Sequence, residues 1–150
     1  MVILVLNCGS SSIKYQVIDM EAASSKLLAK GIVERIGLAE GDLVHKPVGK
    51  EPFELHQPIP DHTTGIRLVL DALTDPKHGV IRSLDEVKAV GHRVAHGGEF
   101  FPASSLGTEE VKEKIRSLCQ IAPKHNPASL DGINALERVT PGTPQVTGLT

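Results

Sequence analysis

The stretch VILVLNCGSSSIKYQVI, residues 2–18, decides the fold class of this chain. Its first five residues are β-branched or aliphatic without interruption, which predicts a strand buried on both faces. Asn7 to Ser11 then supply the residue types of a tight turn. From Ser12 to Ile18 polar and apolar side chains alternate, which predicts a second strand with one buried face. On that strand Ser12 and Lys14 are expected to point the same way.

Hydrophobic periodicity predicts the remaining elements. The expected strands cover 27–36, 89–95 and a stretch beginning at 145, with an edge hairpin over 37–49; the expected helices run from a cap at Asp61 or Thr63 to Leu73, over 108–119 and over 127–139. Three prolines between residues 51 and 60 predict a surface connection with little regular structure. Strands followed by alternating helices and strands indicate one α/β domain with a mixed sheet.

Composition narrows the function classes. The 150 residues are 40% hydrophobic and 23% charged, which is typical of a folded soluble protein. The formal net charge of -2 gives no general attraction to nucleic acid or to an anionic membrane, so neither is expected as a partner. The two cysteines, Cys8 and Cys119, have no CxxC spacing, which favours free thiols in a reducing cytoplasm. The apolar start is too short for a signal peptide or a membrane span.

The turn between the first two strands has the chemistry of a phosphate cradle. Gly9 allows a close approach of the backbone to an anion, Ser10 and Ser12 offer hydroxyl donors, and Lys14 offers an ammonium group. The Walker spacing is absent. An ordinary hairpin turn with a solvated lysine is the alternative interpretation of this segment.

A second polar segment, VGHRVAHGGE at residues 90–99, lies at the end of a predicted strand. Ligands of α/β sheets bind outside the carboxyl ends of strands, and a guanidinium there can grip a carboxylate or phosphate with two parallel hydrogen bonds. Arg93 is therefore the candidate. His92 and His96 are expected on the opposite strand face, bonded to nearby backbone, and a metal site between them is disfavoured.

The third segment, APKHNPASLDG at residues 122–132, precedes and opens the last predicted helix. Pro127 suits the first helical turn, so Asn126 is a candidate cap and His125 is held on a rigid corner. A histidine beside a helix N-terminus can donate to an oxyanion. A capping residue next to a surface ring is the simpler alternative.

Together and in this order, the three segments closely resemble the acetate and propionate kinase family of the actin and sugar kinase superfamily. The motifs are Asn-x-Gly-Ser-Ser-Ser-x-Lys, Gly-His-Arg-Val-x-His-Gly-Gly and His-Asn-Pro, and the resemblance extends from Val2 to about Pro144. It implies a ribonuclease H-like mixed sheet with flanking helices, the first domain of an actin-like ATPase fold. Residues 1–150 would then be an incomplete amino-terminal domain without the nucleotide-binding second domain.

The resemblance also implies an activity and roles for single residues. The family transfers phosphoryl between ATP and a short-chain carboxylate, giving an acyl phosphate and ADP, with Mg²⁺ or Mn²⁺. Asn7 would lie near the metal, Ser10, Ser12 and Lys14 would bind phosphate, Arg93 would bind the carboxylate or the phosphoryl group, and His125 would help to hold that group. The longer parent is expected to be cytoplasmic and to pair as a homodimer, largely through parts that this sequence does not contain.

Three positions depart from the family pattern. Lys124 replaces an expected leucine and Ala95 an expected valine in the acyl pocket, which leaves the acid open between acetate and propionate or a longer one. Thr150 occupies roughly the place of a catalytic aspartate. Because the resemblance implies that the second domain is missing, this chain alone is expected to be inactive. Two other functions stay open: a non-catalytic module that binds phosphate or acyl phosphate, and a sugar kinase, which Arg93 and His125 disfavour.

Overall fold

A computed structural model describes residues 1–21, 24–93 and 127–149. One mixed sheet forms the body of this part, in the spatial order β5-β4-β3-β2-β1-β6-β7. Its strands are β1 (Val2–Cys8), β2 (Ile13–Glu21), β3 (Ser24–Glu34), β4 (Gly41–Pro47), β5 (Phe53–Gln57), β6 (Val87–Arg93) and β7 (Gln145–Leu149). Strands β1 to β5 are antiparallel neighbours, whereas β6 pairs parallel with both β1 and β7. The predicted mixed sheet is confirmed.

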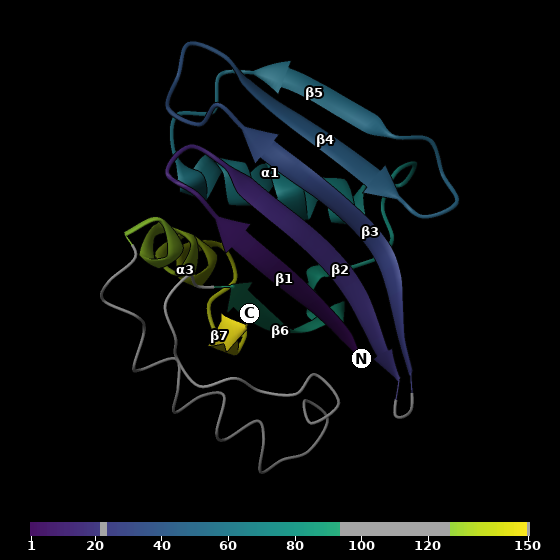
Figure 1. The fold of residues 1–150 in the computed structure, drawn as a ribbon. Helices are drawn as coiled ribbons and strands as arrows, with labels where there is room; N and C mark the ends of the chain where they lie inside the picture. Colours follow the sequence, from purple (N-terminus) through teal and green to yellow (C-terminus); the bar gives the residue numbers. More distant parts are fainter. Residues whose placement is uncertain (22–23, 94–126, 150) are drawn as a thin grey trace.

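The helices α1 (His62–Thr74) and α3 (Pro127–Val139) lie on the same face of this sheet and pack against each other (Figure 1). A short 3-10 helix, η1 (Leu84–Glu86), leads into β6. The core between helices and sheet consists of inward side chains of both layers: Leu4, Leu6, Ile13, Tyr15, Val17, Val33, Leu43, Ile66, Val69, Leu73, Ala135 and Leu136. No helix in the described ranges is long and apolar enough to cross a membrane.

Local sequence accounts for most boundaries. The predicted Asp61 cap is confirmed, because one carboxylate oxygen of Asp61 accepts from both the backbone N–H and the hydroxyl of Thr64, at 2.8 Å each. Strand β3 ends where Arg35 adopts a φ of 61°, a left-handed conformation that a strand cannot continue. The predicted helix over 127–139 and the strand beginning at Gln145 are confirmed. The predicted helix over 108–119 lies outside the described residues.

Two predictions were wrong. The hairpin over 37–49 was expected at the edge of the sheet, but its strand β4 lies between β3 and β5. Residues 51–60 were expected to be irregular, but Phe53–Gln57 forms the edge strand β5. Pro52 and Pro58 flank the strand and do not interrupt it, so neither removes a hydrogen bond from the ladder to β4. Phe53 and Leu55 are half-buried, whereas Glu54 and His56 are exposed, which is the alternation of a strand with one covered face.

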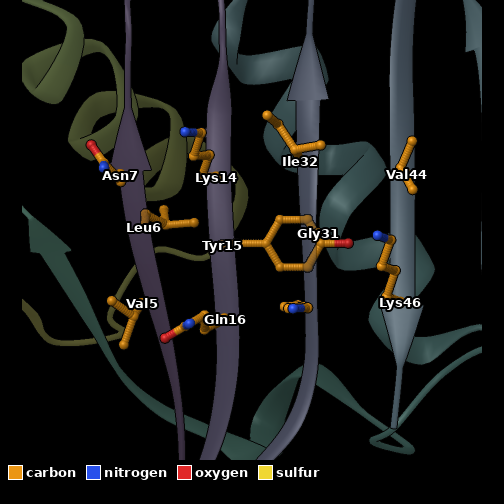
Figure 2. Close-up of a pocket in the computed structure, with 11 residues that line it drawn as sticks. Val5, Leu6, Asn7, Lys14, Tyr15, Gln16, Gly31, Ile32, Val44 and Lys46 are labelled. Carbon is orange, nitrogen blue, oxygen red and sulfur yellow. The ribbon is translucent and has the colours of Figure 1, made fainter.

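A short chain of hydrogen bonds lies within the core. Figure 2 shows the Tyr15 ring extending across Gly31 toward β4, and a Cβ on Gly31 would clash with that ring. The Tyr15 hydroxyl donates to Nδ1 of the fully buried His45 at 2.6 Å, and His45 Nε2–H donates to the backbone oxygen of His78 at 3.0 Å. Burial lowers the pKa of His45, which keeps the ring neutral and suited to this pattern.

His92 belongs to a second buried chain of hydrogen bonds, between β6, β7 and α3. Its ring is 1% exposed and Nε2–H donates to Oε1 of Gln145 at 2.6 Å, while the amide of Gln145 donates to the oxygen of Ile133 in α3. The structural role expected for His92 is therefore observed, although its partner is a side chain and not backbone. Burial lowers the pKa of His92 from 6.5 to about 4.

The buried His92 ring predicts a specific dependence of stability on pH. Between pH 6.5 and pH 4 the unfolded chain binds a proton at this ring that the folded chain does not, so stability is full above this window and falls as pH falls through it. From pH 7 to pH 5, urea unfolding should show a loss of about 2 kcal/mol from this residue.

The His92→Gln variant, which cannot titrate, should lose about 2 kcal/mol less than the unmodified chain over the same range. A direct NMR titration of the His92 ring in the unmodified chain provides a second measurement. A ring that protonates near its ordinary value of 6.5 would contradict the prediction.

Candidate functional site

The candidate site is built on the turn between β1 and β2. The two strands pair up to Asn7 with Lys14 and Cys8 with Ile13, and the N–H of Gly9 donates to the oxygen of Ser12 at 2.8 Å to close the turn. A Cβ on Gly9 would lie 2.7 Å from the Ser12 hydroxyl oxygen, so glycine permits this close approach. The turn anticipated from the sequence is observed.

Two segments distant in sequence hold the turn in place. His62, buried at the start of α1, donates from Nε2 to the oxygen of Gly9 at 2.9 Å. On the other side, the N–H of Ile36 donates to the oxygen of Ser11 at 2.9 Å. Sequence reasoning missed His62, because nothing in its local pattern distinguishes a helix-start histidine that bonds a remote turn.

The polar groups of the turn face outward. Asn7, Ser10 and Lys14 are exposed and Ser12 is half-buried. No hydrogen bond within the described ranges engages the hydroxyls of Ser10, Ser11 or Ser12, or the ammonium group of Lys14. Asn7 and Lys14 lie opposite each other on the same sheet face and border one hollow, whereas the serines are not part of its lining. These free donors can bind an anion.

Arg93 is the last residue of β6, and its backbone is near this turn. Strand β6 runs parallel to β1, with His92 beside Leu6, so the carboxyl ends of both strands lie at one edge of the sheet. That edge is where ligands of α/β sheets bind. The side chain of Arg93 lies outside what the structure describes, as do His125, His96, Lys124, Ala95 and Thr150 in full.

Cys8 ends β1 on the covered face, next to Gly132 of α3. It is a free, buried thiol, and burial raises its pKa to about 12, with a further contribution from the charge of Asp131. The thiol is therefore protonated at neutral pH and unsuited to nucleophilic or metal chemistry. Cys119, the other cysteine, lies outside the described residues.

The residues present offer only part of a metal site. Within the described ranges no group of three or more His, Cys, Asp or Glu side chains could hold a metal ion. The exposed amide oxygen of Asn7 could serve as one oxygen ligand, which is compatible with Mg²⁺, because that ion commonly keeps several waters and substrate phosphates as ligands.

Comparison with known proteins identifies the family. Residues 2–149 match the sequence model of the Acetokinase family. The chain belongs to this family. It is 53% identical over 144 residues to acetate kinase 2 of Clostridium perfringens and 54% identical over 147 residues to the acetate kinase of Moorella thermoacetica, which covers 96% and 98% of this chain. The chain spans only 36% of the length of each of these Acetokinase relatives.

Solved Acetokinase structures share the fold. The crystal structure of the Porphyromonas gingivalis acetate kinase matches with a TM-score of 0.75 and 40% identity, and that of a Francisella tularensis propionate kinase with 0.65 and 33%. Each match covers 99% of this chain but only 37% and 36% of the respective structures. The expected ribonuclease H-like mixed sheet with flanking helices is thus confirmed.

Replacing Gly9 tests the turn. In Gly9→Ala the new methyl group displaces the Ser12 hydroxyl, which is the end of a mobile side chain, so the free energy of unfolding should change by less than about 1 kcal/mol. Phosphate binding, followed by amide shifts of residues 10–12, should weaken roughly tenfold, the effect of one lost charge-assisted hydrogen bond.

Ser12→Ala, which removes the same hydroxyl, should weaken phosphate binding to a similar extent. Ser25→Ala, at an exposed serine on β3 far from the turn in sequence, is the control and should bind as the unmodified chain does. Unchanged phosphate binding in Gly9→Ala and Ser12→Ala would exclude the Ser12 hydroxyl as an anion ligand.

Proposed function

We propose that this chain is the amino-terminal, substrate-binding part of a short-chain carboxylate kinase. The complete enzyme would transfer phosphoryl between ATP and acetate or propionate to give an acyl phosphate and ADP. One observation carries the proposal: a turn with free serine hydroxyls and Lys14 lies at the same sheet edge as the backbone of Arg93, in a chain of the Acetokinase family.

Phosphoryl transfer suits these residue types. It needs positioning of the reacting groups and neutralisation of charge on the phosphoryl oxygens more than it needs a covalent catalyst. In the proposal, Ser10 and Ser12 donate hydrogen bonds to phosphate oxygens and Lys14 balances their charge. Arg93 grips the carboxylate or the phosphoryl group with paired hydrogen bonds, and His125 helps to hold that group.

A divalent metal belongs to the same proposal. Mg²⁺ or Mn²⁺, bound together with ATP, would supply positive charge at the phosphates. Asn7, whose amide lies next to Lys14 on the sheet, would contribute one oxygen ligand or orient a metal-bound water. A cytoplasmic location and a homodimeric full-length enzyme are further parts of the proposal, with ATP, ADP and a small carboxylate as its partners.

The first test concerns the chain by itself. Because it spans about a third of the length of its relatives, we expect no acyl phosphate from ATP and acetate in an assay coupled to ADP release. Appreciable turnover would contradict this expectation. Titration with acetyl phosphate distinguishes the alternative of a non-catalytic binding module: tight, saturable shifts at Gly9 and Ser10 would favour the module, whereas weak binding suits an open half of a cleft.

The second test concerns Arg93 in a full-length protein that contains this chain. Arg93→Ala should lower kcat at least roughly a hundredfold, since a charge that stabilises transferred phosphoryl is lost. Arg67→Ala is the matched control, because Arg67 is exposed on α1 and should leave turnover unchanged. An unchanged rate in Arg93→Ala would exclude Arg93 from the site.

A further inference from the structure

A hollow lies on the sheet face opposite α1 and α3. The proposed kinase reaction involves only some of the residues that line it. The hollow has a volume of about 450 Å³ and extends over β1, β2, β3 and β4 (Figure 2). Two amide and three ammonium side chains are part of its lining: Asn7, Gln16, Lys14, Lys30 and Lys46. Only Asn7 and Lys14 belong to the turn segment, so Lys30 and Lys46 have no role assigned so far.

The arrangement of the lysines is electrostatically unfavourable without a partner. Lys30 on β3 and Lys46 on β4 are direct cross-strand neighbours, and Lys14 lies one row away on β2. Like charges directly opposite on one sheet face destabilise the pairing. All three side chains are exposed, and within the described ranges none of their ammonium groups has a hydrogen bond or an ion pair.

Nearby carboxylates do not neutralise this charge. Asp42 lies on the same face but is engaged by His56 Nδ1 at 2.7 Å and by Arg35 at 3.6 Å. The hydrogen bond from His56 is the main cause that lowers the pKa of Asp42, so the Asp42 carboxylate interacts with His56 and Arg35 and not with the lysines. Glu54 lies beside Val44 on the edge strand β5, and Glu34 lies opposite Asp42 on β3; neither makes an ion pair with any described lysine. The lysine group therefore keeps a net positive charge.

An apolar surface adjoins the two opposed lysines. Ile32 on β3 and Val44 on β4 are themselves direct cross-strand partners, in the row next to Lys30 and Lys46. Both are half-buried and line the hollow, together with the buried Val5 of β1. An apolar body resting on Ile32 and Val44 would place an attached anionic group within reach of the lysine amines.

From these observations we infer that the hollow binds a small amphiphilic anion, an apolar body that carries a phosphate or carboxylate group. The anionic group lies between Lys30 and Lys46, and the body packs on Ile32 and Val44. The volume suits a small molecule, since ligand pockets commonly span about 300–1,000 Å³. Lys14 borders both this hollow and the phosphate turn, so occupation of the hollow is expected to influence the turn through that residue.

Hexyl phosphate and inorganic phosphate are the probes for a test with the chain. Hexyl phosphate should shift the amide resonances of Ile32, Val44 and Lys46 saturably, and should bind at least roughly tenfold more tightly there than inorganic phosphate, which has no apolar body. Lys30→Gln and Lys46→Gln should each weaken the binding of hexyl phosphate roughly tenfold. Lys26→Gln, the control, removes the same charge from an exposed position on β3 outside the hollow. Its affinity for hexyl phosphate should stay within about twofold of that of the unmodified chain.

Each contrary result has a distinct meaning. Shifts confined to residues 9–12, with Lys46→Gln unaffected, would overturn the inference and leave the proposed kinase function intact. Absence of saturable binding would also overturn it and would favour an acidic protein segment as the occupant of this face. Shifts at Ile32 and Val44 that respond to Lys30→Gln and Lys46→Gln, with the turn silent, would support binding in the hollow independently of the kinase proposal and would contradict the expected influence on the turn.

Discussion

The burial of β1 on both faces and its pairing on both edges is the constraint from which the rest of the structure follows. Leu4 and Leu6 face the helices, Ile3 and Val5 are buried on the other side, and β2 and β6 bond its two edges. Because β6 runs parallel to β1, the turn after β1 and the end of β6 meet at one edge of the sheet. A central strand of this kind fixes the place where a ligand can be held.

The turn owes its shape to contacts made at both of its ends. Residues 9–12 contain no bulky side chain that could anchor them, so their order depends on His62 and Ile36, which bond the oxygens of Gly9 and Ser11. Helix α1 thus positions the turn as well as covering the sheet, and the Asp61 cap sets where that helix begins. With its backbone oxygens engaged, the turn can leave its hydroxyls free to face solvent.

The two faces of the sheet differ in the kinds of side chain that they carry. The covered face combines an aliphatic core with two neutral histidines, His45 and His92, each of which is kept uncharged by burial and bonded to specific partners. The opposite face presents lysines around Ile32 and Val44, next to the turn. Successive side chains along a strand point to opposite faces, so the same strands supply both the core and the lysine-bearing face.

Local sequence alone determined the β1–β2 hairpin, the α1 and α3 helices, and the mixed sheet, because hydrophobic period, cap and turn residues act over a few positions. The same local reasoning missed β5, because the prolines that predicted an irregular connection flank this strand. Only the tertiary structure decided that His62 holds Gly9, that Gln145 binds His92, and that Lys30 faces Lys46. Such pairs are set by strand register and helix docking, which join residues 16 or more positions apart and leave no periodic trace in the sequence.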